Sequence, residues 1–192
     1  MSTTDPVIDG PTITLEGAPA AVHGIVKSGG DPVSGAPVFV GKATSYKSKN
    51  HAGLGKDIDI NMFPSPWFYP DDGGRFFCTA GFLVTQDPDT KWTNLGTYRA
   101  QVLGKDILGS QIIKGKHGDM HMKKYAERGE LMPAAYVVGT DPVLFLASST
   151  MVSAQTDEYE VAGSLRGAAR HVLRARDRRD HVHAQLQPRD RV

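Results

Sequence analysis

The expected order of secondary structure predicts an α+β fold. Three apolar or alternating segments are typical of strands and occupy residues 76–85, 97–103 and 107–113. Segments typical of helices follow, with one short strand at 134–138 among them, at residues 119–128, 143–147 and 157–165. Because a doubly wound parallel sheet would alternate strands and helices from the start, this order favours an α+β domain.

Turn signals separate the three expected strands. Residues 76–85 are rich in apolar and aromatic side chains and predict a buried strand, which ends at the turn Asp87-Pro88-Asp89-Thr90. A turn with glycine at residues 104–106 separates the next two, so that an antiparallel meander is expected. Upstream, residues 57–61 alternate as a short edge strand would, and two prolines within residues 63–67 predict an extended segment.

Capping residues delimit the expected helices. Asp119 can cap the start of the helix at 119–128, and Gly129 follows it as a C-cap. Asp141 followed by Pro142 is typical of a helix start. Proline has no backbone N–H, and at the first position of a helix that N–H would have no partner within the helix, so nothing is lost.

Composition divides the chain into three regions. Residues 1–60 are rich in Gly, Pro, Ser and Thr and predict an extended N-terminal region, residues 61–167 form the regular core, and residues 168–192 hold seven of the eleven arginines. That tail has three interpretations: a basic arm for nucleic acid or acidic lipid, a disordered end, or a segment read out of frame. We favour the last two, because interspersed aspartates weaken the positive field and no aromatic side chain is present to stack on bases.

Overall composition predicts a cytoplasmic protein. The chain is 40% hydrophobic and 22% charged, as ordinary soluble proteins are. No apolar run approaches the roughly 20 residues of a membrane helix, and the first residues do not resemble a secretory signal. The single cysteine, Cys78, excludes an internal disulfide. A net charge of +1 gives no general reason to expect nucleic acid as a partner.

Three polar clusters are candidates for a functional site. The first runs from Asn94 to Arg99, whose guanidinium suits carboxylate or phosphate. The second, residues 114–119, places two lysines, two glycines and a histidine before an expected helix, whose free N–H groups can face an anion. The third joins the hydroxyls of residues 148–150 to the acidic residues at 157–160. On spacing alone, each cluster is more typical of a structural role.

Together the clusters supply an amide, an imidazole and a carboxylate. Such a set of oxygen and nitrogen ligands is typical of Mn²⁺ or Mg²⁺. Cysteine is absent from the set, which disfavours a structural zinc site. Cys78 lies in an apolar segment, a poor place for an activated thiolate.

Six motifs follow one another between residues 56 and 167, over more than half of the chain. They are Asp72-Gly73-Gly74-Arg75, Thr85-Gln86-Asp87-Pro88-Asp89-Thr90, Asn94-Leu95-Gly96-Thr97-Tyr98-Arg99, Gly115-Lys116-His117-Gly118, Gly139-Thr140-Asp141-Pro142 and Glu158-x-x-x-Ala162-Gly163-x-Leu165-Arg166-Gly167. In order and spacing, this series resembles the UbiD family of carboxy-lyases.

The resemblance implies a fold and an activity. It implies a split β-barrel core of the flavin-reductase-like kind with flanking helices, and a decarboxylase that acts on an aromatic or α,β-unsaturated carboxylic acid. The implied cofactor is prenylated FMN, supplied by a separate flavin prenyltransferase. A divalent metal, usually Mn²⁺ and often accompanied by K⁺, is implied beside the flavin phosphate. Intact members of the family are homo-oligomers.

The resemblance also implies residue roles. Asn94, His117 and Glu158 match the metal ligands, with Glu158 preferred to Glu160 by counting back from Ala162-Gly163. Arg99 matches the arginine of the catalytic Arg-Glu-Glu group. The residues that match contacts to the cofactor are Thr97, Tyr98, Arg99, Lys116, His117, Ser149, Thr150 and Met151.

One departure from the family pattern modifies the expectation. The family places its catalytic glutamates beyond the Leu-Arg-Gly motif, where this chain has the Arg-rich tail instead. We therefore expect a truncated or frame-disrupted protein with an incomplete barrel and a partial cofactor site, whose activity is open. Two other hypotheses stand beside the decarboxylase: a non-catalytic flavin- or phosphate-binding subunit that needs a partner chain, and a nucleic-acid-binding protein that uses its tail.

Overall fold

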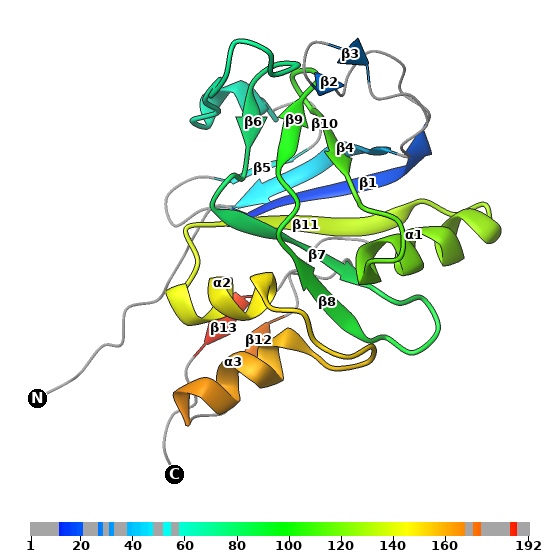
Figure 1. Ribbon diagram of the computed structural model, residues 1–192, viewed down its shortest axis with the longest axis vertical. Coiled ribbons are helices and arrows are strands. Elements are labelled where there is room, and N and C mark those ends of the chain that lie inside the picture. The colour runs from blue at the N-terminus through cyan, green and yellow to red at the C-terminus, as the bar shows by residue number, and fades with distance from the viewer. Residues whose placement is uncertain are drawn as a thin grey trace, which may run out of the picture.

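The fold is α+β, as the sequence predicts. The computed structural model describes residues 12–20, 27–28, 31–32, 38–47, 52–54, 58–167, 171–173 and 185–187. Within these residues, one antiparallel sheet of nine strands is accompanied by three α-helices and two small two-stranded sheets (Figure 1).

The main sheet has the strand order β6-β9-β10-β4-β1-β11-β7-β8, and β5 pairs with β4 beside this path. Its strands are β1 (Thr12–Ala20), β4 (Val38–Lys47), β5 (Ala52–Leu54), β6 (Phe76–Phe77), β7 (Gly81–Gln86), β8 (Thr93–Gly96), β9 (Ala100–Val102), β10 (Ile107–Gln111) and β11 (Met132–Val138). The small sheets pair β2 (Lys27–Ser28) with β3 (Asp31–Pro32) and β12 (His171–Leu173) with β13 (Gln185–Gln187).

The predicted strand at 76–85 is divided in two. Cys78 adopts a φ of 60°, in the left-handed region, so the backbone cannot continue as one extended strand. As a result β6 pairs with β9, whereas β7 lies between β11 and β8. The two halves therefore belong to different parts of the sheet.

The predicted antiparallel meander is wrong in its middle connection. β9 pairs with β10 as expected, and β6 pairs with β9, but β7 pairs with β8, a strand that was not predicted. Residues 97–99 lie outside any strand, and the chain there leaves β8 at one end of the sheet and enters β9 near the other. The predicted strand at 97–103 is thus reduced to Ala100–Val102. The strands inserted between the two pairs include β1 and β4, which come from the N-terminal region.

All three predicted helices are present, with boundaries shifted by one or two residues. They are α1 (His117–Glu127), α2 (Pro142–Ser149) and α3 (Glu158–Arg166). Asp141 caps α2 by accepting from the N–H groups of Val143 and Leu144, and Asp157 caps α3. Helix α1 begins earlier than predicted, with Lys116 as its N-cap, so Asp119 lies in its first turn and not at its cap.

The edge strand predicted at residues 57–61 is wrong where the structure describes it. Asp59 accepts a hydrogen bond from the backbone N–H of Asn61 and caps a short 3-10 helix, η2 (Ile60–Met62). Ile58 and Ile60 are buried, which explains why their alternation resembles a strand. Most of the N-terminal region and of the Arg-rich tail lies outside the described residues, and the expected disorder of the tail remains a prediction.

Strands β7 and β11 are buried on both faces, which places the core and the helices. Leu83 and Tyr136 belong to one apolar cluster, together with Met122 of α1. Their strand neighbours Phe82 and Val137 belong to a second cluster on the other face, because successive side chains alternate across a strand. Helices α2 and α3 lie side by side and cover that second face (Figure 1). Among the described residues, no helix is both long and apolar enough to cross a membrane.

Candidate functional site

A cavity of about 810 Å³ opens where β8, the start of α1, the end of α2 and the start of α3 converge. Pockets for ligands of cofactor size commonly have volumes of about 300–1,000 Å³. Every site residue predicted from the sequence lines this cavity: Asn94, Thr97, Tyr98, Arg99, Lys116, His117, Ser149, Thr150, Met151 and Glu158. The structure therefore brings together segments that are up to 64 positions apart in sequence, since Asn94 and Glu158 line the same wall.

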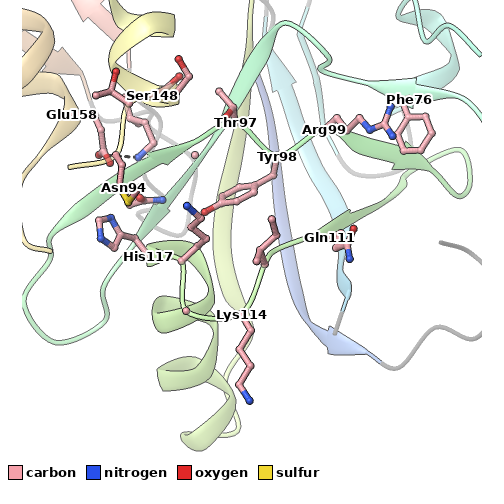
Figure 2. A pocket seen from close by; sticks show the side chains of 18 of the residues that line it. Phe76, Asn94, Thr97, Tyr98, Arg99, Gln111, Lys114, His117, Ser148 and Glu158 are labelled. Carbon is pink, nitrogen blue, oxygen red and sulfur yellow. Dashed lines mark hydrogen bonds between the residues drawn. The ribbon is translucent and has the colours of Figure 1, made fainter. Parts of the chain in front are cut away.

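The three predicted metal ligands gather at one end of the cavity (Figure 2). Asn94 comes from β8, His117 from the first position of α1 and Glu158 from the first position of α3. Glu158 is only 2% exposed, whereas Glu160 points to solvent. The choice of Glu158 over Glu160, made by counting along the chain, thus falls on the carboxylate that faces the cavity.

The carboxylate of Glu158 is buried with little compensation. One of its oxygens accepts a hydrogen bond from the backbone N–H of Leu95 at 3.0 Å. Burial raises the pKa of Glu158 to about 7, and the hydrogen bond from Leu95 offsets this only in part. Among the residues that the structure describes, no cationic side chain forms an ion pair with Glu158. Burying an unpaired acid is costly, and a bound cation would relieve that cost.

The imidazole of His117 is held neutral and in place. Burial, and next the charge of Lys116, lower the pKa of His117 below its ordinary value, so the ring is in the form that binds metals. Its ring lies 4.7 Å from the ring of Trp92, centroid to centroid. The indole N–H of Trp92 donates to the carbonyl of Thr156 at 3.0 Å. Trp92 therefore links the start of α1 to the loop that precedes α3.

The wall between the two ends of the cavity is formed by Tyr98. A Cβ added to Gly96 would lie 2.1 Å from Cε2 of this ring, so only glycine leaves room for it. Burial raises the pKa of Tyr98, while hydrogen bonds from the Gly118 N–H and the Asn94 side chain act in the opposite direction. The ring thus rests on Gly96 and reaches the start of α1.

Residues 97–99 alternate in exposure although they lie outside any strand. Thr97 and Arg99 are exposed and Tyr98 is half-buried, although all three line the cavity.

The loop before α1 is shaped to present backbone and a lysine to the cavity. Gly115 has a φ of 84°, a left-handed conformation that favours glycine. Asp119 accepts a hydrogen bond from the Gly115 N–H at 2.7 Å and another from Lys123 at 2.6 Å, which fixes the loop against the first turn of the helix. Lys116, the residue before α1, lines the cavity, so an anion at the start of this helix would meet positive charge. The side chain of Lys114 extends away from the site (Figure 2).

The hydroxyls at the end of α2 line the cavity as acceptors. Ser149 and Thr150 both donate to the carbonyl of Leu146, at 2.9 and 2.8 Å. A hydroxyl whose proton is used in this way offers only lone pairs to a ligand. Met151 lies at the rim and is 85% exposed.

Arg99 lies at the opposite end of the cavity from Glu158 (Figure 2). Its guanidinium stacks over the ring of Phe76, 4.1 Å from the ring centre. One of its nitrogens lies 3.9 Å from a carboxylate oxygen of Asp72. The Arg99 side chain is 48% exposed, so it remains accessible to a carboxylate that enters the cavity.

The donor set fits a hard or borderline divalent cation. Among the described residues, no group of three or more His, Cys, Asp or Glu side chains is placed to hold a metal. The set at this site contains only one acid and one imidazole, and its third member is the amide of Asn94. Such mixed oxygen and nitrogen ligation suits Mn²⁺ or Mg²⁺, and the buried, poorly compensated carboxylate of Glu158 supplies a reason for a cation to bind.

The chain belongs to the UbiD family. Residues 40–186 match the family model described as the 3-octaprenyl-4-hydroxybenzoate carboxy-lyase Rift-related domain. The match extends beyond the motif-bearing region on both sides and includes part of the Arg-rich tail. Over 114 residues the chain is 31% identical to the uncharacterized protein sll0936 of Synechocystis. This matched stretch covers 59% of this chain and 23% of that protein.

Solved structures of UbiD-class enzymes have the same fold. The enzyme HmfF from Pelotomaculum thermopropionicum in complex with FMN is 28% identical, with a TM-score of 0.62, over 69% of this chain and 29% of its own. Vanillic acid decarboxylase from Sedimentibacter hydroxybenzoicus, in its closed form, is 28% identical with a TM-score of 0.61, over 69% of this chain and 28% of its own. This chain thus spans less than a third of the length of these relatives.

Several residues at the site were not predicted from the sequence. Asp72 and Phe76 contact Arg99, and Trp92 supports His117. His121, which packs against Trp92, was not predicted either. Its spacing of four from His117 is the signal in the sequence, because residues four apart share one face of a helix.

Proposed function

We propose that this chain forms the cofactor- and metal-binding part of a decarboxylase that releases CO₂ from an aromatic or α,β-unsaturated acid. The observation that carries the proposal is the convergence of Asn94, His117 and Glu158 at one end of a cavity whose other end holds Arg99. Mn²⁺, with K⁺ as a further candidate, would be held by the three ligands. Prenylated FMN would lie along Thr97–Arg99, with its phosphate toward the metal and the start of α1.

The residues of the chain divide the work between binding and orientation. When bound, the prenylated flavin would supply the electron sink that accepts the electrons left by departing CO₂. A flavin phosphate carries about two negative charges near neutral pH, as other phosphate monoesters do, and the cation and Lys116 would offset them. Arg99 would bind the substrate carboxylate through its planar fork. The stacking of Arg99 on Phe76 would hold that fork in one plane.

Further features of the proposal follow from the family. They include a split β-barrel for the core, to whose sheet β1 and β4 of the N-terminal region contribute strands, a flavin prenyltransferase as supplier of the cofactor, assembly into homo-oligomers and a cytoplasmic location. The comparisons with decarboxylases favour this class over a non-catalytic flavin-binding subunit. A subunit of that kind would show decarboxylation only after mixing with a second chain.

Retention of flavin tests the proposal. Purified protein is incubated with Mn²⁺ and prenylated FMN and passed through a desalting column, and bound flavin is measured by absorbance. We expect the wild type to retain flavin in a manner that depends on the metal, and Asn94→Ala and His117→Ala to lose it. Equal retention by the wild type and both variants, or no retention by any, would overturn the proposal.

A further inference from the structure

The metal ligand Asn94 is paired directly across the sheet with a buried threonine. Thr85 of β7 lies opposite Asn94 of β8 in the antiparallel register, and both side chains are nearly inaccessible to solvent. The amide nitrogen of Asn94 donates to the hydroxyl oxygen of Thr85 at 3.4 Å. This contact directs the NH₂ end of the amide toward Thr85, and the same side chain also hydrogen-bonds Tyr98 on the cavity wall. The carbonyl oxygen is the end of the amide that would face a metal.

The orientation of this amide decides whether Asn94 can bind a cation. The strand fixes the backbone of Asn94, but the terminal torsion of an asparagine is broad and nearly two-fold. Rotation by half a turn would present the NH₂ group, which cannot bind a cation, in place of the carbonyl oxygen, which can. A partner that accepts from the NH₂ group therefore selects the orientation that binds metal.

The hydroxyl of Thr85 has its own partner in the core. It lies 3.0 Å from Nδ1 of His121, on α1. Because the amide of Asn94 can only donate through its NH₂ group, the hydroxyl accepts from Asn94 and is free to donate its proton to the imidazole. In this arrangement Asn94 donates a hydrogen bond to Thr85, and Thr85 donates one to His121.

His121 is placed to accept the second of these two hydrogen bonds, the one from the hydroxyl of Thr85. Its ring is fully buried, and its Nε2 has no hydrogen-bond partner among the described residues. It packs edge-on against Trp92, with 4.8 Å between ring centres. Burial lowers the pKa of His121 to about 4, so the ring is neutral and one of its nitrogens can accept. Trp92 also contacts His117, so the same buried aromatic side chain supports two sides of the metal site.

From these contacts we infer that Thr85 and His121 are positioning residues, which hold the amide of Asn94 with its oxygen toward the metal. The inference rests on the proposed function, since it concerns the ligand set of that site. Residues outside the ligand shell that orient metal ligands commonly change metal affinity by about 10–100-fold when they are replaced.

Mn²⁺ alone is the probe, so that the test requires neither flavin nor turnover. The dissociation constant is measured from the signal of free Mn²⁺ in electron paramagnetic resonance titrations of the metal-free protein. Thr85→Val removes the hydroxyl and keeps the branched shape, and we expect about 10–100-fold weaker binding. Thr85→Ser keeps the hydroxyl, and we expect affinity within about threefold of the wild type, well below the loss seen for second-layer residues.

Two further variants separate positioning from folding. Thr93→Val makes the same chemical change on β8, at a position that alternation places on the opposite face from Asn94, and we expect no change in Mn²⁺ affinity. The double variant Thr85→Val/His121→Leu removes donor and acceptor together. Because the hydroxyl and the imidazole are replaced together, neither is left buried without the other, and the cost to the melting temperature should be limited to the lost Asn94 contact and to repacking of the core. Mn²⁺ affinity should fall as in the single variant.

The outcomes distinguish this inference from the proposed function. If the wild type binds Mn²⁺ and Thr85→Val or the double variant binds it equally well, the positioning role is wrong and the metal site stands. Should Thr85→Val fail to fold, equal binding by the folded double variant would still overturn the inference. If the wild type shows no Mn²⁺ binding while Asn94→Ala behaves identically, the proposed function falls and the inference falls with it.

Discussion

The carboxylate of Asp87 ties the β7–β8 hairpin, which carries Asn94, to helix α1, which carries His117. One oxygen accepts from the backbone N–H groups of Asp89 and Thr90, and the other accepts from Lys124 at 2.6 Å. Replacing Asp87 by Asn keeps the shape and removes the charge. We expect this change to lower the free energy of unfolding and to loosen the hairpin against the helix.

The magnitude follows from the pKa of Asp87. Burial on its own would raise this pKa, but the hydrogen bonds from Lys124 and the two backbone N–H groups outweigh it and lower the pKa from 3.8 to about 2. At about 1.4 kcal/mol per pKa unit, the ionised form contributes about 2 kcal/mol of stability at pH 7. Because the folded pKa is depressed, this contribution is present above pH 3.8 and is lost as the pH falls toward 2.

Urea denaturation, followed by tryptophan fluorescence at several pH values, measures this contribution. The wild type should exceed Asp87→Asn by about 2 kcal/mol at pH 7, and the difference should fall to about half near pH 3. Asp89→Asn is the matched control, because its half-exposed ion pairs should contribute less than about 1 kcal/mol. Equal stability of the wild type and Asp87→Asn at pH 7, or a difference that does not change with pH, would refute the reasoning.

Three further predictions concern the cavity. Gly96→Ala places a methyl group 2.1 Å from the ring of Tyr98 and should sharply reduce flavin retention on a desalting column, whereas Gly104→Ala, whose nearest neighbour would lie at 3.7 Å, should retain flavin normally. Glu158→Gln should abolish Mn²⁺ binding and raise the free energy of unfolding of the metal-free protein by up to about 3 kcal/mol at pH 7, as measured by thermal or urea melts. Burial raises the pKa of this acid from 4.5 to about 7, so between these values and above them the negative charge destabilises the folded state relative to the unfolded one. A less stable variant would contradict this. Arg99→Ala should lower any decarboxylation measured with the flavin-loaded protein at least about 100-fold, as loss of a charge-assisted contact to the substrate can, while Mn²⁺ affinity is unchanged. A parallel loss of both would show that Arg99 acts through the fold.

Local chemistry predicted the helices better than the sheet. Asp141 followed by Pro142 identifies the start of α2 because both residues act within one turn of the chain. The division of residues 76–85 into two strands depends on the left-handed conformation of Cys78. Cysteine is not typical of that conformation, so the sequence did not predict the division. The strand order depends on β1 and β4, whose Gly- and Pro-rich surroundings gave little periodic signal.

The candidate site shows the same division between local and tertiary information. The predicted residues came from motifs with fixed spacing, and they all line one cavity because β8, the end of α2 and the starts of α1 and α3 converge there. Thr85 and His121 were not predicted as site residues. Their contact joins positions 36 apart and exists only once α1 has packed on the β7–β8 hairpin. Glu158 was chosen by counting, and its burial is visible only in the fold.

The position of a bound metal is the most direct test of the account. Crystals of the protein soaked with Mn²⁺ and measured near the manganese absorption edge would locate the ion by its anomalous scattering. We predict one peak coordinated by the amide oxygen of Asn94, a ring nitrogen of His117 and the carboxylate of Glu158. A peak bound elsewhere, or flavin bound in the cavity without any metal beside these three side chains, would contradict the account.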